Sequence, residues 1–227
     1  MVTSRLTPPP GGYCSAVQTS RRRILIAGAA AAGLAAVGIP RSQATPVAVD
    51  GLADLEQRHN AKVGFHGRNL ASGRTLDHNP DDLFATCSAF KAYVAGAILL
   101  KDQRGELRLT DEVFIDPAVS IPVASPTIGP HVGGTLPLAA LCAAAVRQSD
   151  NTATNLMLGM LGGPSAVTEF ARQVGDDRTW MVRWEPELNS AYPGDPRDTT
   201  SPRAMGTGFR TMLTGGENPV LDEPHRA

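Results

Sequence analysis

The chain has 227 residues, of which 42% are hydrophobic and 19% are charged, and its formal net charge is −1. These values are typical of a globular protein with one domain or two subdomains. A net charge so close to zero gives no sign of the basic surface that binds nucleic acid. Three cysteines are too few for a disulfide scaffold, and the five histidines show no metal-binding spacing. We therefore expect a monomer without a metal ion or cofactor.

An export signal is the first feature along the chain. Residues 1–19 form a leader with few large apolar side chains, and Arg21-Arg22-Arg23 then precedes an Ala/Gly-rich run, Ile24–Ile39. The pattern resembles a twin-arginine signal, with small residues at the cleavage site near Ala44. A membrane anchor is disfavoured because a spanning helix needs about 20 apolar residues. We expect a leader and signal over residues 1–44, contact with the export machinery, and a mature protein in the periplasm, the cell envelope or outside the cell.

A helix and a hairpin are predicted next. Residues 51–60 combine apolar side chains with interspersed charges, which fits a short amphipathic helix. Partial alternation over residues 62–70, followed by turn residues and a second short strand over 75–77, predicts a β-hairpin. His66 and Arg68 in the first strand favour an edge or half-exposed position.

The longest apolar stretch opens with Cys87-Ser88-Ala89-Phe90-Lys91 and continues to Leu100. It predicts a buried helix with Ser88 in its first turn and Lys91 almost one turn further on, on the same face. The Lys91 amine would then hydrogen-bond the Ser88 hydroxyl, and free N–H groups at the helix start would favour an oxyanion. A serine near a helix start is usually only an N-cap. Here, however, Lys91 would be buried and would need a partner.

Most of the remaining chain is predicted to be helical. Residues 111–137 have no sustained period, and we expect a long irregular connection of the kind that lines sites. Helices are predicted over 136–148, 152–161 and 166–174, and again after Pro202. They indicate an all-helical subdomain beside the hairpin.

Two further stretches place polar residues in unusual settings. Ser149-Asp150-Asn151 separates two helices, a position where such triplets usually serve as caps. Glu185 and Asn189 bracket a proline-stiffened turn within a Pro- and Gly-rich segment, which predicts an Ω-type loop. Arg183 and Asp198 flank this loop, and we expect them to close it with a salt bridge that fixes its geometry.

Two neighbouring features are expected to be structural. Trp180 and Trp184 are interpreted as packing residues rather than as platforms for a ligand. The acidic pair Asp176-Asp177 is interpreted as a solvated turn rather than as a catalytic dyad.

In this order, the Ser-x-x-Lys motif at Ser88, the Ser-Asp-Asn motif at Ser149 and the loop around Glu185 resemble the class A serine β-lactamases. The resemblance covers roughly residues 50–226. It implies the α+β fold shared with penicillin-binding proteins, with an all-helical subdomain and an α/β subdomain. It also implies hydrolysis of the β-lactam ring of penicillin- and cephalosporin-type antibiotics, and so antibiotic resistance.

The resemblance assigns a role to each motif residue. Penicillin-binding proteins share the acylation chemistry but stall at the ester, so the water-activating carboxylate is what separates a hydrolase from a covalent antibiotic target. Which residue takes the first proton, Lys91 or Glu185, stays open. The implied roles are nucleophile for Ser88, its hydrogen-bonded partner for Lys91, proton relay to the lactam nitrogen for Ser149, substrate-amide contact for Asn151, and binding of the hydrolytic water for Glu185 with Asn189.

One motif of the family, Lys-Thr-Gly, does not occur in these 227 residues. In the family it lies on a central strand, so the resemblance implies that the catalytic domain, residues 45–227, is C-terminally truncated and that its antiparallel sheet is incomplete. An isolated hairpin is only marginally stable, and we expect this chain by itself to fold poorly and to have little or no lactamase activity. The alternatives are an exported penicillin-binding D-Ala-D-Ala peptidase relative and a non-enzymatic remnant.

Overall fold

The computed structural model describes residues 47–48, 51–215 and 219–226. The predicted leader and export signal lie outside these residues. None of the helices in the described ranges is both long and apolar enough to cross a membrane.

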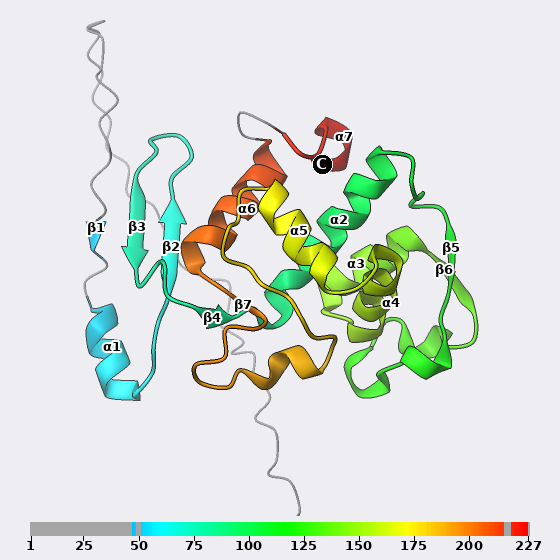
Figure 1. Cartoon of the computed structure of the whole chain (residues 1–227), viewed down its shortest axis with the longest axis horizontal. Coiled ribbons are helices and arrows are strands. Elements are labelled where there is room, and N and C mark those ends of the chain that lie inside the picture. Colours follow the sequence, from blue (N-terminus) through cyan, green and yellow to red (C-terminus); the bar gives the residue numbers. More distant parts are fainter. Residues whose placement is uncertain (1–46, 49–50, 216–218, 227) are drawn as a thin grey trace, which may run out of the picture. The chain divides into compact units, whose positions relative to one another are not determined.

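Helix α2, Lys91–Gln103, is the centre of the helical part (Figure 1). It packs against α3 (Leu138–Gln148), α4 (Asn151–Leu161) and α5 (Ser165–Gln173). Neighbours cover α2 on several sides, and its residues from Ala92 to Leu100 are all apolar, aromatic or small, as expected for a buried helix. Gly96 permits this packing, since a Cβ there would lie 2.7 Å from both Met212 Sδ and Phe170 Cζ. The predicted all-helical cluster is therefore confirmed, with boundaries within two residues of those expected.

A three-stranded sheet lies beside the helices, in the order β1-β3-β2. Strands β2 (Phe65–Arg68) and β3 (Thr75–His78) form the predicted antiparallel hairpin, with Phe65 opposite His78. Strand β1 (Val47–Ala48) pairs with β3 in parallel, which was not predicted. Helix α1 (Leu52–His59) connects β1 to the hairpin. The fold is thus α+β, as predicted.

Helix α6, Pro202–Thr214, lies between strand β2 and helix α5 (Figure 1). Ser201 caps its start by accepting a hydrogen bond from Ala204 N, and Pro202 occupies its first position, where a missing N–H costs nothing. On the sheet side, His66 lies against Gly206, whose Cβ would come within 3.0 Å of the ring. A final short helix, α7 (Glu223–Arg226), ends the described chain.

The connection over residues 111–137 is more regular than predicted. Its ends pair as strands β5 (Glu112–Phe114) and β6 (Thr135–Pro137), and three short 3₁₀ turns lie between them. Strands of three residues are too short for alternation to be recognised, which explains the error. Because Pro137 belongs to β6, helix α3 begins at Leu138 rather than at residue 136.

Candidate functional site

Ser88 is an exposed residue at a sharp change of direction. Strand β4 (Phe84–Ala85) pairs with β7 (Thr199–Thr200) and leads into a 3₁₀ turn, Cys87–Phe90, which continues as α2. Ser88 therefore lies in this turn rather than in the first α-helical turn. Cys87 has φ +42°, an uncommon left-handed conformation immediately before the serine. The turn leaves the Ser88 hydroxyl accessible from solvent.

Ser149 provides the hydroxyl closest to Ser88. It ends helix α3 in the left-handed conformation, with φ +56°, and its Oγ donates a hydrogen bond of 2.7 Å to Ser88 Oγ. Lys91 Nζ in turn donates to Ser149 O at 2.7 Å and to Ser149 Oγ at 3.0 Å. The predicted direct hydrogen bond from Lys91 to Ser88 is not found among the described residues. The positive φ of Ser149 brings its hydroxyl between the two groups, so Lys91 is connected to Ser88 through Ser149.

Lys91 is almost completely buried, at 1% exposure, and it has the partners that such a cation needs. Its Nζ donates to Asn151 Oδ1 and lies 3.1 Å from Glu185 Oε1. Burial lowers the pKa of Lys91 from its ordinary value, while the Glu185 carboxylate opposes that shift. Lys91 therefore joins the Ser-Asp-Asn motif on one side to the Ω-type loop on the other.

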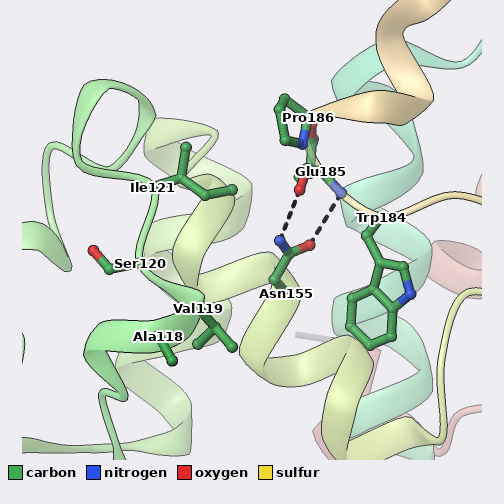
Figure 2. A pocket seen from close by; sticks show the side chains of 8 residues that line it. All are labelled: Ala118, Val119, Ser120, Ile121, Asn155, Trp184, Glu185 and Pro186. Atoms are coloured by element: carbon green, nitrogen blue, oxygen red, sulfur yellow. Dashed lines mark hydrogen bonds between the residues drawn. The ribbon is translucent and has the colours of Figure 1, made fainter.

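Glu185 is buried at 3% exposure, and hydrogen bonds hold both its carboxylate and its backbone. Its Oε2 accepts a hydrogen bond of 2.7 Å from Asn189 Nδ2, as expected for two residues that bracket the turn. Its backbone is held by Asn155: Asn155 Nδ2 donates to Glu185 O at 2.9 Å, and Glu185 N donates to Asn155 Oδ1 at 3.1 Å (Figure 2). Sequence reasoning missed Asn155. Its position four residues after Asn151, on the same face of α4, was the available signal.

The predicted clamp of the loop is present and involves more than one ion pair. Arg183 Nε pairs with the Asp198 carboxylate, which is completely buried. Asp198 Oδ1 also accepts hydrogen bonds from Val182 N at 2.7 Å and from Arg183 N at 3.0 Å. Since main-chain donors are fixed by the carboxylate, the clamp sets the path of the backbone that leads to Glu185.

A cavity of about 400 Å³ adjoins Glu185 (Figure 2). Trp184 forms part of its wall and is 40% exposed, and Trp180 is 44% exposed, so neither lies in the core. The prediction of a solvated turn is wrong for Asp176, because its side chain is completely buried. Other cavity-lining residues are Ala118, Val119, Ser120, Ile121, Asn155 and Pro186.

The described residues contain no group of three or more His, Cys, Asp or Glu side chains that could hold a metal ion. The groups that are brought together are instead an exposed serine hydroxyl, a second serine, and a buried lysine paired with a glutamate. A hydroxyl within reach of such groups is the arrangement that nucleophilic serine chemistry requires.

Comparison with known proteins identifies the family. A model of the beta-lactamase enzyme family matches residues 48–226. A β-lactamase of Streptomyces lavendulae is 42% identical over 207 residues, which cover 86% of this chain and 67% of that protein. A β-lactamase of Rhodobacter capsulatus is 42% identical over 164 residues, covering 72% of this chain and 56% of the relative.

Solved structures agree. A β-lactamase from Desulfarculus baarsii superposes with a TM-score of 0.72 at 44% identity, covering 77% of this chain and 64% of that one. The class A β-lactamase of the last common ancestor of Gram-negative bacteria superposes with a TM-score of 0.73 at 43% identity, covering 77% and 65%. The chain belongs to the class A β-lactamase family, and it spans between 56% and 67% of the length of these relatives.

Proposed function

We propose that this protein hydrolyses β-lactams through an ester formed at Ser88. The observation that carries the proposal is the unbroken series of contacts Ser88–Ser149–Lys91–Glu185, with distances of 2.7, 3.0 and 3.1 Å. Proteins named β-lactamases, at about 42% identity, support the choice of substrate.

The proposed acylation uses the exposed end of this series. Ser88 Oγ attacks the lactam carbonyl carbon and loses its proton toward Lys91 or Glu185. The C–N bond of the ring breaks, and Ser149 delivers a proton to the departing nitrogen. Because Ser149 Oγ contacts both Ser88 Oγ and Lys91 Nζ, a proton moving between these two passes through it. Asn151 is proposed to contact the amide of the substrate.

The proposed deacylation uses the buried end. Glu185 removes a proton from a water molecule, whose oxygen attacks the ester carbonyl, and Ser88 is released with its proton restored. Asn189, which already contacts Glu185 Oε2, is proposed to help hold this water. Without this step the ester would persist, as in a penicillin-binding peptidase.

The other two functions predict different results with a fluorescent penicillin. Transient labelling supports the hydrolase, persistent labelling supports the peptidase, and no labelling supports a non-enzymatic protein. The label is followed by gel fluorescence over hours at high protein concentration. Ser88→Ala must abolish the label in either enzymatic case.

Replacement of the proposed base tests the deacylation step. In Glu185→Gln, the amide cannot accept a proton from water, so we expect Ser88 to be labelled while release of the label slows at least about 100-fold. Glu187→Gln is the matched control, because Glu187 is exposed and only two residues away. Release from Glu185→Gln at the parental rate would contradict the assignment.

A location outside the cytoplasm is also proposed. It is supported by the arginine pair and the small-residue cleavage site in the first 44 residues.

A further inference from the structure

A buried polar network lies on the side of α2 away from Lys91, since two residues of helix separate Lys91 from Tyr93. Tyr93, two residues after Lys91, is completely buried, and its hydroxyl donates a hydrogen bond of 2.9 Å to Asp176 Oδ2. Asp176 Oδ1 accepts from Arg178 N at 3.0 Å and from Thr179 N at 2.8 Å. Buried polar groups are costly unless they are paired, so this carboxylate and hydroxyl have a structural purpose.

The network joins the two ends of the segment that carries Glu185. Thr179 Oγ1 lies 2.5 Å from Asp176 Oδ2 and 2.7 Å from Thr200 Oγ1. Thr179 is where the chain enters the segment, and Thr200 is where it leaves in strand β7. Trp180 also pairs with Thr199: the Trp180 N–H donates a hydrogen bond of 3.0 Å to Thr199 O. Both ends of the segment are therefore tied to each other and, through Asp176, to helix α2.

The fold makes room for the Tyr93 hydroxyl at one position. Gly208 of α6 faces it, and a Cβ at Gly208 would lie only 2.0 Å from the Tyr93 oxygen and 2.8 Å from Cζ. Tyr93 also makes edge-to-face contacts with Phe170 and Phe209, at centroid distances of 6.0 and 5.3 Å. Gly208, Phe170 and Phe209 thus pack around the ring, so its hydroxyl can hold Asp176 in a fixed position.

We propose that Tyr93 is a positioning residue for Glu185, acting through Asp176, Thr179 and Thr200. The same helix carries Lys91 and Tyr93, so α2 contacts the segment directly at the Lys91–Glu185 pair and reaches its entry point, Thr179, through the Tyr93–Asp176 hydrogen bond. The Tyr93–Asp176 hydrogen bond fixes the ends of the segment relative to α2. Glu185 is then held at the right distance from Lys91. This inference rests on the proposed role of Glu185 in deacylation.

Tyr93→Phe removes only the hydroxyl and is the direct test. We expect release of a fluorescent penicillin label to slow about tenfold while its formation stays within about twofold, because misplacement of one group affects the step it serves. We also expect faster amide hydrogen exchange over residues 179–200, with exchange in α3 and α4 unchanged. Tyr192→Phe is the matched control, since Tyr192 lies in the same segment but is 66% exposed. Thr200→Val, which removes the other end of the connection, should reproduce the effect.

The outcomes are distinguishable. Wild-type release and wild-type exchange in Tyr93→Phe would overturn the positioning role, as would a uniform rise in exchange across α3, α4 and the loop. A wild-type chain that takes up no label overturns the hydrolase proposal instead, and the exchange over residues 179–200 then decides the positioning role alone.

Discussion

Lys91 illustrates how the surroundings of a residue shift its pKa. An exposed lysine keeps its proton far above neutral pH, but burial at 1% exposure disfavours the cation and lowers its pKa. The Glu185 carboxylate at 3.1 Å limits this effect and keeps the pair stable in the interior. Removal of the Glu185 charge leaves Lys91 as an unpaired buried cation. Gln is still a better test at Glu185 than a smaller apolar residue, because its amide oxygen can accept a hydrogen bond from Lys91 Nζ.

Asn155 supports a second prediction at the scale of the residue. Asn155→Ala removes both hydrogen bonds to the backbone of Glu185, and we expect a loss of about 1–3 kcal/mol of unfolding free energy because these groups lose their partners. Release of the penicillin label should slow as well, since Glu185 is no longer fixed. Urea titration and the labelling assay measure the two effects. A variant with unchanged stability and release would show that the Ω-type loop holds Glu185 without α4.

At the scale of the element, His225 connects helix α7 to α2. His225 Nδ1 lies 2.5 Å from Asp222 Oδ1, and its Nε2 lies 2.9 Å from Asp102 Oδ2. A ring that donates from both nitrogens must be protonated. The hydrogen bond to Asp222, followed by that to Asp102, raises the pKa of His225 above its ordinary value. Leu221 beside it is 1% exposed, so this attachment closes one end of the core.

This arrangement predicts a pH dependence with a definite sign. The stabilisation is complete below the ordinary histidine pKa of about 6.5 and is lost as the pH rises through the higher folded pKa. We expect hydrogen exchange at Leu221, corrected for intrinsic rates, to be slower at about pH 5.5 than at about pH 8.5. His225→Gln should abolish this difference, whereas His59→Gln, an exposed residue of α1, should keep it. Equal protection of Leu221 at both pH values in the wild type would contradict the prediction.

At the scale of the whole molecule, the N-terminal segment allows a test of export that does not depend on the site. Replacement of Arg21 and Arg22 by Lys keeps the charge but removes the arginine pair, and we expect the protein to stay in the cytoplasm. Fractionation of a bacterial host that has twin-arginine export measures this, with Arg41→Lys as the control. Normal export of the double variant would indicate a different route.

The expectation that the chain folds poorly by itself stays a prediction. The helical part has a continuous core around α2, whereas the sheet in the described residues has three strands, one of them with two residues. A cooperative thermal transition of the purified 227-residue chain would contradict the expectation.

Local patterns were sufficient for much of this protein. The apolar run after Ser88, the hairpin and the helices on either side of Ser149 follow from periodicity and turn residues, because such elements are specified by neighbours in sequence. The motif residues Ser88, Lys91, Ser149 and Glu185, and the family they indicate, were also evident from the sequence. The strands β5 and β6 were not, since three residues give no recognisable period.

Only the tertiary structure decided how the site residues contact one another. The left-handed conformation of Ser149 inserts its hydroxyl between Lys91 and Ser88, and Asn155 reaches the backbone of Glu185 from a different element. Asp176 was expected in solvent, but α2 and α6 bury it beside Tyr93. The sequence determined which side chains are proposed to carry the chemistry. Their partners depend on contacts between residues as far as 60 or more positions apart, such as Lys91 with Asn151 and Ser149 with Ser88, and no local pattern encodes those.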